Sequence, residues 1–162
     1  MENEKQRKEA IMRVAISQAR VTSSEGIGGP FGAAIVKDGE LICICNNRVL
    51  KDNDPTAHAE IVAIREACKK LSTHDLSGCE LYATGQPCPM CLSAIIWANI
   101  KKVYYCTDYD QAAKIGFRDD HIYNYLRLAD PSESDLVTLE RINLKEGAEL
   151  FKEYAENNGI IY

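Results

Sequence analysis

The sequence predicts an α/β fold, in which strands and helices alternate along a chain of 162 residues. Short apolar runs bounded by Gly, Pro or Asn are typical of strands, and they alternate with segments whose apolar residues recur every three or four positions. A hairpin turn joins the first two predicted strands. The chain is 46% hydrophobic and 27% charged, which is too apolar for disorder and fits one domain over residues 1–162.

The first predicted element is a helix at residues 3–25. Ile11, Val14 and Ala19 fall on one helical face of this segment. Residues 26–30 contain three glycines and a proline, and we expect them to end the helix because glycine and proline together break helices.

Two strands joined by a hairpin come next, at residues 33–36 and 41–46. The turn at residues 37–40 contains an Asp-Gly pair, which is typical of a two-residue hairpin turn. Strand alternation places Cys43 and Cys45 on one face and the two neighbouring isoleucines on the other.

A second helix, a third strand, a third helix and a fourth strand follow. The polar residues 53–56 predict the start of a helix that runs to Leu71 with apolar residues at helical steps. Residues 79–84 and 102–107 are predicted strands, and residues 88–98 form a helix after a Gly-Gln-Pro turn.

The last third of the chain is less regularly patterned and more acidic. Helices are expected at 120–127 and 145–157, with a strand at 136–139 between them. Residues 108–162 hold 6 basic and 12 acidic side chains, and the formal net charge of the chain is −5. Proteins that bind nucleic acid usually present a basic face, so this balance argues against a nucleic-acid partner, although it leaves room for a local basic groove.

The cysteines and the N-terminus indicate the compartment. Seven cysteines is an odd number, and the mixed charges at the N-terminus do not resemble a signal peptide. We therefore expect a cytoplasmic location, where thiols are buried, catalytic or metal-bound rather than paired. No apolar run approaches the ~18 residues of a membrane span, so no membrane partner is expected.

Two short motifs carry the chemistry: residues 58–60 (His-Ala-Glu) and residues 87–91 (Pro-Cys-Pro-Met-Cys). Cys88 and Cys91 lie three residues apart at a predicted helix start, where two thiols can chelate one ion and the positive helix end favours thiolates. With His58 as third ligand, the donor set suits Zn²⁺ and leaves an open position, as in catalytic sites. A Cys-x-x-Cys motif alone is equally compatible with a redox pair.

Glu60 is the expected catalytic residue, a carboxylate that moves protons between a zinc-bound water and the substrate, a role worth about 10²–10⁴-fold. Residues two apart on a regular helix lie about 200° apart around its axis. His58 and Glu60 must therefore lie at the first turn and converge beyond the helix end. A structural zinc module is the non-enzymatic alternative, but it requires a fourth protein ligand, and none lies at natural spacing near Cys88 and Cys91.

Together the motifs form the His-x-Glu…Pro-Cys-x-x-Cys pattern, and the chain resembles the cytidine deaminase-like superfamily of zinc deaminases over roughly residues 8–125. Residues 30–33 (Pro-Phe-Gly-Ala) and 46–48 (Asn-Asn-Arg) also look like that group. The resemblance implies a three-layer α-β-α fold with a mixed five-stranded sheet, one Zn²⁺ per chain, and hydrolytic loss of ammonia from an amino-substituted ring.

Residues 53–60 and 116–123 are similar to bacterial guanine deaminases in particular. This resemblance implies conversion of guanine to xanthine, a step of guanine catabolism. It also implies a homodimer in which a C-terminal segment, about residues 130–162, is exchanged so that Tyr162 covers the partner's site. Gln86 departs from the pattern, because an acidic residue is usual there.

Five residues are candidate substrate contacts. The amide of Asn47 donates and accepts hydrogen bonds and so suits a purine edge, although Asn-Arg is also ordinary turn sequence. Asp119 either accepts hydrogen bonds from the base or caps a helix, and Arg118 beside it departs from the usual acidic residue. Phe31 and Trp97 either stack on a flat base or belong to the core, and Tyr162 is either a lid or a frayed end.

The sequence motifs leave two alternatives to guanine as the substrate. A guanosine deaminase would share the motifs, because tolerance of a ribose depends on the depth of the pocket. A tRNA-specific adenosine deaminase would also share them, and it would flip one base of the RNA into the same pocket.

Overall fold

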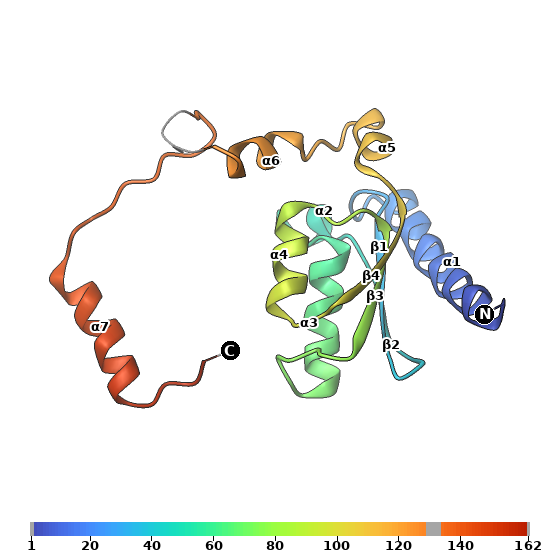
Figure 1. Ribbon diagram of the computed structural model, residues 1–162. Coiled ribbons are helices and arrows are strands. Elements are labelled where there is room, and N and C mark those ends of the chain that lie inside the picture. Colours follow the sequence, from blue (N-terminus) through green and yellow to red (C-terminus); the bar gives the residue numbers. More distant parts are fainter. Residues whose placement is uncertain (1, 129–133, 162) are drawn as a thin grey trace. The chain divides into compact units, whose positions relative to one another are not determined.

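The computed structural model describes residues 2–128 and 134–161, which divide into two compact units, Met1–Asp119 and Asp120–Tyr162. The elements of the first unit are α1 (Glu2–Ser24), β1 (Gly32–Lys37), β2 (Glu40–Asn46), α2 (Val49–Asp52), α3 (Ala59–Leu71), β3 (Cys79–Gly85), α4 (Pro89–Trp97), β4 (Lys102–Thr107) and α5 (Tyr109–Lys114) (Figure 1). The second unit contains α6 (Asp120–Leu126) and α7 (Lys145–Glu156).

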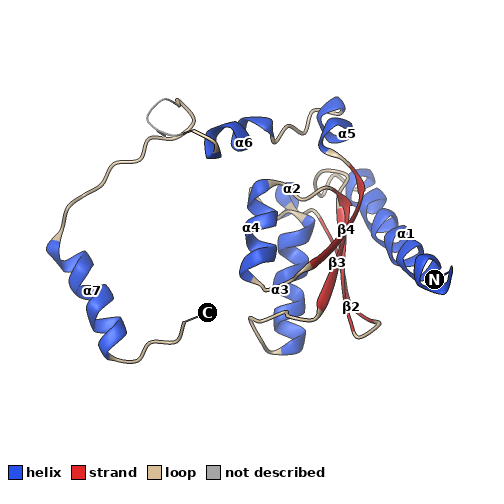
Figure 2. Ribbon diagram, viewed as in Figure 1, coloured by secondary structure: helices blue, strands red, loops and turns tan. Residues whose placement is uncertain are grey.

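The first unit is built on one mixed sheet with the strand order β2-β1-β3-β4. β1 runs antiparallel to both of its neighbours, and β3 runs parallel to β4. Helix α1 covers one face of the sheet, while α3 and α4 lie on the other (Figure 2). This arrangement confirms the predicted three-layer α/β fold.

The sheet has four strands in the described part of the chain, so the expected five-stranded sheet is wrong for these residues. The segment 136–139, predicted as a strand, forms none, and its apolar side chains are 47–73% exposed. A strand needs a neighbouring strand for its backbone hydrogen bonds. Residues 136–139 belong to the second unit, whose described residues contain no other strand.

The start of α3 also differs from the prediction. Asp54 Oδ1 accepts hydrogen bonds from the backbone N and Oγ1 of Thr56, at 2.8 and 2.7 Å, so residues 53–56 form a side-chain-closed turn instead of a helix start. Helix α3 begins only after His58.

Helix α5 was not among the predicted elements. Asp108 and Gln111 form a capping box at its start, which is a signal that can be read from the sequence.

A β-bulge in β2 changes the alternation expected there. The pairing of β1 with β2 shifts register, so that Ile42 is an extra residue. Cys43 and Cys45 share one face as predicted, but Ile42 joins them on the α3 side, whereas Ile44 packs on the α1 side.

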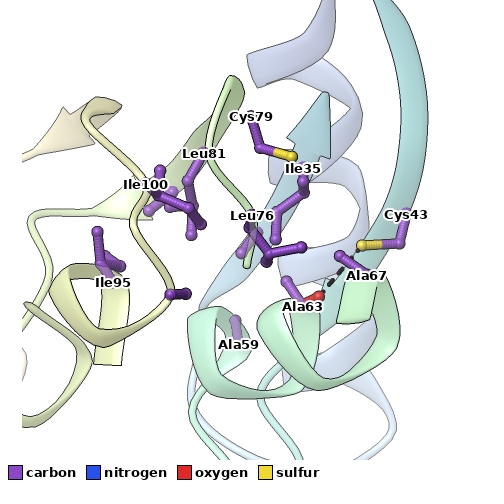
Figure 3. Close-up of a cluster of buried hydrophobic side chains, with 13 residues drawn as sticks. Ile35, Cys43, Ala59, Ala63, Ala67, Leu76, Cys79, Leu81, Ile95 and Ile100 are labelled. Atoms are coloured by element: carbon purple, nitrogen blue, oxygen red, sulfur yellow. Dashed lines mark hydrogen bonds between the residues drawn. The ribbon is translucent and has the colours of Figure 1, made fainter. Parts of the chain in front are cut away.

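The main core lies between the sheet and helices α3 and α4 (Figure 3). Ile35 and Leu81 from the two central strands meet Ile95 of α4 there, and all three are nearly inaccessible to solvent. A smaller cluster around Tyr82 packs against α1 on the other face. Because both faces of β1 are covered, residues 32–36 form an unbroken apolar and buried run instead of alternating, and only Lys37 at the end of the strand is polar.

The contact between α1 and β1 requires a glycine at position 32. A Cβ at Gly32 would overlap with the carbonyl oxygen of Ala15 and lie 3.2 Å from the backbone N of Ala19. These backbone atoms cannot rotate away, so we expect Gly32→Ala to lower the free energy of unfolding by about 1–3 kcal/mol. Urea denaturation checks this, with Gly147→Ala as control, because a Cβ at Gly147 meets nothing within 4 Å. An unchanged urea midpoint for Gly32→Ala would contradict the close approach.

The second unit exposes much of its apolar surface. In α7, Leu150, Phe151 and Tyr154 are 49–78% exposed, and the Tyr154 hydroxyl donates a hydrogen bond to the Ile160 carbonyl at 2.7 Å. The tail thus folds back onto the end of its own helix. Among the helices of residues 2–128 and 134–161, none is long and apolar enough to cross a membrane.

Candidate metal centre and active site

The three predicted metal ligands converge at the amino ends of α3 and α4. His58 precedes α3, Cys88 precedes α4, and Cys91 lies in the first turn of α4. His58 Nδ1 lies 3.6 Å from Cys88 Sγ and 3.5 Å from Cys91 Sγ. In a tetrahedral zinc site with bonds of ~2.1 Å to nitrogen and ~2.3 Å to sulfur, the two atoms are about 3.6 Å apart. The residues present therefore fit one Zn²⁺.

The backbone at each helix start turns these side chains toward one another. His58 (φ −63°, ψ 154°) and Cys88 (φ −66°, ψ 169°) are extended N-cap residues, and neither side chain caps its own helix. Pro89 occupies the first position of α4, where its fixed φ is suited to the helix. His58 precedes the helix and Glu60 lies in its first turn, so the two side chains do not have to share one face of a regular helix. This agrees with the placement that the two-residue spacing predicts.

Hydrogen bonds within the cluster favour the thiolate at Cys88, whereas the contact with Cys88 raises the pKa of Cys91. Contacts from the Cys91 thiol and then from the His58 ring lower the pKa of Cys88 to about 4, despite burial. The contact with Cys88 raises the pKa of His58. A thiolate at Cys88 is the form that a soft divalent cation binds.

Glu60 lies in the first turn of α3, beside the cluster but not among its three ligands. Its side chain is buried, at 7% exposure, and burial raises the pKa of Glu60 to about 7. A carboxyl group with a pKa in this range both releases and accepts protons near neutral pH. The arrangement therefore combines three side chains that can hold one metal ion with a buried carboxyl group beside them.

A cavity opens beside the cluster. Its walls are Phe31, Asn47, His58, Glu60, Gly85, Gln86, Cys88, Ala112, Phe117 and Asp119. The structure thus brings three of the predicted substrate contacts, Phe31, Asn47 and Asp119, to one cavity with Glu60 and two of the three metal ligands.

Asn47 and Asp119 offer the cavity two polar groups of different kinds. Asn47 is buried, and its Oδ1 accepts a hydrogen bond from the backbone N of Val49 at 3.1 Å, so it closes a turn and lines the cavity at once. Asp119 lines the same cavity as His58, and its negative charge adds to the effect of Cys88 in raising the pKa of His58.

The aromatic candidates differ in position. Phe31 lines the cavity and meets Phe117 edge to face, with ring centroids 5.0 Å apart and planes at 88°. Trp97 lies at the end of α4, is 68% exposed and does not line this cavity. Tyr162 lies outside the described residues. Phe117 and Gln86 were not predicted as contacts, although Phe117 belongs to the segment 116–123 that resembles guanine deaminases.

A second cavity, of about 300 Å³, lies among α1, the ends of β3 and β4, and α5. It shares Phe31 and Ala112 with the first cavity but contains none of the metal ligands and not Glu60. The chemistry therefore belongs to the first cavity.

The chain is similar to known deaminases in sequence and in structure. Residues 5–107 match the family model described as the cytidine and deoxycytidylate deaminase zinc-binding region. A guanine deaminase of Bacillus subtilis is 45% identical over 138 residues, which span 85% of this chain and 87% of that protein. A tRNA-specific adenosine deaminase of Aquifex aeolicus is 38% identical over 148 residues, 91% and 93% of the two chains. The X-ray structure of guanine deaminase from Bacillus subtilis matches with a TM-score of 0.86 at 42% identity, over 91% of this chain and 93% of that one.

Proposed function

This chain belongs to the cytidine and deoxycytidylate deaminase family of zinc-dependent hydrolases, and we propose that it converts guanine to xanthine and ammonia. The observation that carries the proposal is the convergence of His58, Cys88 and Cys91 into one cluster, of which His58 and Cys88 line the same cavity as Glu60. The likeness to guanine deaminase of Bacillus subtilis extends over 85% of the chain and supports guanine as the substrate.

His58, Cys88 and Cys91 would hold the ion. When bound, Zn²⁺ supplies an acidified water molecule and polarises the reacting centre. Glu60 would then carry both protons of that water. Its carboxylate accepts the first and delivers it to a ring nitrogen of the base, and it then accepts the second and delivers it to the departing amine. A pKa of about 7 suits a group that must accept and donate in the same turnover.

The remaining walls of the cavity are proposed to orient the base. The Asn47 amide offers hydrogen bonds to the purine edge, the Asp119 carboxylate accepts from N–H groups, and the Phe31 ring offers an aromatic surface. Trp97 does not line this cavity, so the proposal assigns it no contact with the base. Tyr162 from a second subunit is proposed to cover the cavity. A homodimer with exchanged C-terminal segments and a cytoplasmic location stay predictions.

A tRNA-specific adenosine deaminase is the second candidate function. The relative in Aquifex aeolicus, 38% identical over 91% of this chain, favours it. The acidic balance of residues 108–162 opposes it, because RNA binding gains affinity from basic side chains.

Ammonia release by the zinc-loaded protein distinguishes these functions. The substrates are guanine, guanosine, adenine, cytidine and a tRNA anticodon stem. Release from guanine alone supports the proposal, whereas release from guanosine but not guanine indicates a nucleoside deaminase. Inosine formation in the RNA, lost in the variant Glu60→Gln, indicates the tRNA enzyme.

Deletion of residues 160–162 tests the proposed lid. We expect kcat/KM for guanine to fall up to about tenfold, since an aromatic contact contributes about 0.5–1.5 kcal/mol and ~1.4 kcal/mol corresponds to a factor of ten. The zinc content of the deletion variant serves as the control, because no described metal ligand lies in the tail. Unchanged kcat and KM would show that Tyr162 covers no active site.

A further inference from the structure

The glycine pair at positions 28 and 29, between α1 and β1, has a role beyond ending a helix. We infer that it positions the substrate-binding side chains: Gly28 makes room for Asn47, and Gly29 makes room for the Phe31–Phe117 ring pair. The inference rests on the proposed function, because it concerns the cavity proposed to bind the purine. Neither glycine has a positive φ, so alanine at either site would act chiefly through the contacts of its added methyl group.

Gly28 lies directly against the Asn47 amide. A Cβ at residue 28 would overlap with Asn47 Oδ1 and stand 3.0 Å from both Asn47 Cγ and the Asn47 carbonyl oxygen. Oδ1 is the atom that accepts the hydrogen bond from Val49 N. The methyl group would therefore displace the amide from the bond that orients it.

The backbone beside Gly28 has little freedom to relieve this overlap. The carbonyl oxygen of Ile27 accepts hydrogen bonds from the backbone N of Leu50 at 3.2 Å and of Lys51 at 3.0 Å. These bonds hold the glycine segment to α2, the helix that Asn47 itself precedes. The Asn47 side chain is consequently the part that moves.

Gly29 lies against the two rings. A Cβ at residue 29 would stand 2.9 Å from Phe117 Cζ and 3.0 Å from Phe31 Cδ2 and Cε2, so a ring would have to shift. The Phe31 ring is also confined at Gly85, where a Cβ would lie 3.2 Å from Phe31 Cε1. Phe31 thus lies between two glycines and meets Phe117 edge to face, which restricts the plane of its ring beside the cavity.

Neither added methyl group has a metal ligand among its nearest atoms, which belong to Asn47, Phe31 and Phe117. Substitution at Gly28 or Gly29 should therefore disturb the orientation of the base while the zinc stays bound. Because the two glycines contact different side chains, their effects should be separable.

Double-mutant cycles test this separation. We expect Gly28→Ala and Gly29→Ala each to lower kcat/KM for guanine about tenfold, mainly through KM, with one zinc per chain retained. Coupling is expected between residues in contact and not between residues with separate partners. The effect of Gly28→Ala should thus fall below twofold in an Asn47→Ala background, and that of Gly29→Ala should shrink in a Phe117→Ala background. In the crossed pairs, Gly28→Ala with Phe117→Ala and Gly29→Ala with Asn47→Ala, the two effects on kcat/KM should multiply. Gly147→Ala should behave as wild type.

Three results would overturn the inference: kcat/KM within twofold of wild type in both alanine variants, multiplicative effects in the contacting pairs, or a crystal structure of Gly28→Ala that retains the bond between Val49 N and Asn47 Oδ1. The crystal structure decides the point without any substrate. If wild-type protein deaminates a different base from the panel, the proposed function fails, and the same cycles on that base decide the positioning role.

Discussion

Glu60→Gln is expected to reduce guanine turnover by about 10²–10⁴-fold while one zinc ion per chain remains bound. The amide has the shape of the carboxyl group but can neither accept nor deliver a proton at neutral pH. Burial opposes the charged form of Glu60, as its raised pKa indicates, so the neutral amide should be accommodated without loss of stability. Steady-state kinetics, zinc analysis and urea denaturation of the same preparation measure the three quantities.

Glu66→Gln is the matched control. Glu66 lies on the same helix, and its carboxylate lies 3.6 Å from Lys70 Nζ, outside the cavity that contains Glu60. The control should keep wild-type kcat. Activity retained by Glu60→Gln would refute its role as proton carrier, whereas loss of zinc from that variant would make Glu60 a part of the metal site.

Cys91→Ser is expected to remove the zinc and the activity together. Cys91 is fully buried and contributes one of three ligands, so the remaining pair of side chains binds the ion too weakly to retain it during dialysis. We expect zinc content below one tenth of wild type and ammonia release at background. Elemental analysis and the ammonia assay measure both.

Cys106→Ser provides the comparison, because Cys106 is an exposed thiol on β4 and does not belong to the cluster. It should keep both zinc and activity. Treatment of the wild type with a chelator should abolish turnover, and added Zn²⁺ should restore it. Stoichiometric zinc in Cys91→Ser, or activity in fully chelated wild type, would contradict the three-ligand centre.

Short-range patterns in the chain were sufficient for much of the architecture. The alternation of strands and helices follows from apolar periodicity, whereas the three-layer arrangement was implied by the family resemblance. The helix start at Cys88 agrees with a Pro at the first helical position, but the capping box at Asp108 was not used to predict α5. Where one local signal competed with another, as at Asp54, the turn formed and the helix began later. The fifth strand failed because alternation describes one segment and says nothing about the neighbour that a strand requires.

Some features of the candidate site likewise follow from local sequence, and others depend on tertiary contacts. The types and spacings of His58, Glu60, Cys88 and Cys91 suffice to indicate a zinc ion and a proton carrier, because each motif occupies one helix start and its geometry is local. The contacts of Phe117 with Phe31, and of the glycine pair with the side chains around it, join segments that are far apart along the chain. No periodicity or spacing encodes such contacts, since they exist only after the sheet and its covering helices have set the distances between those segments.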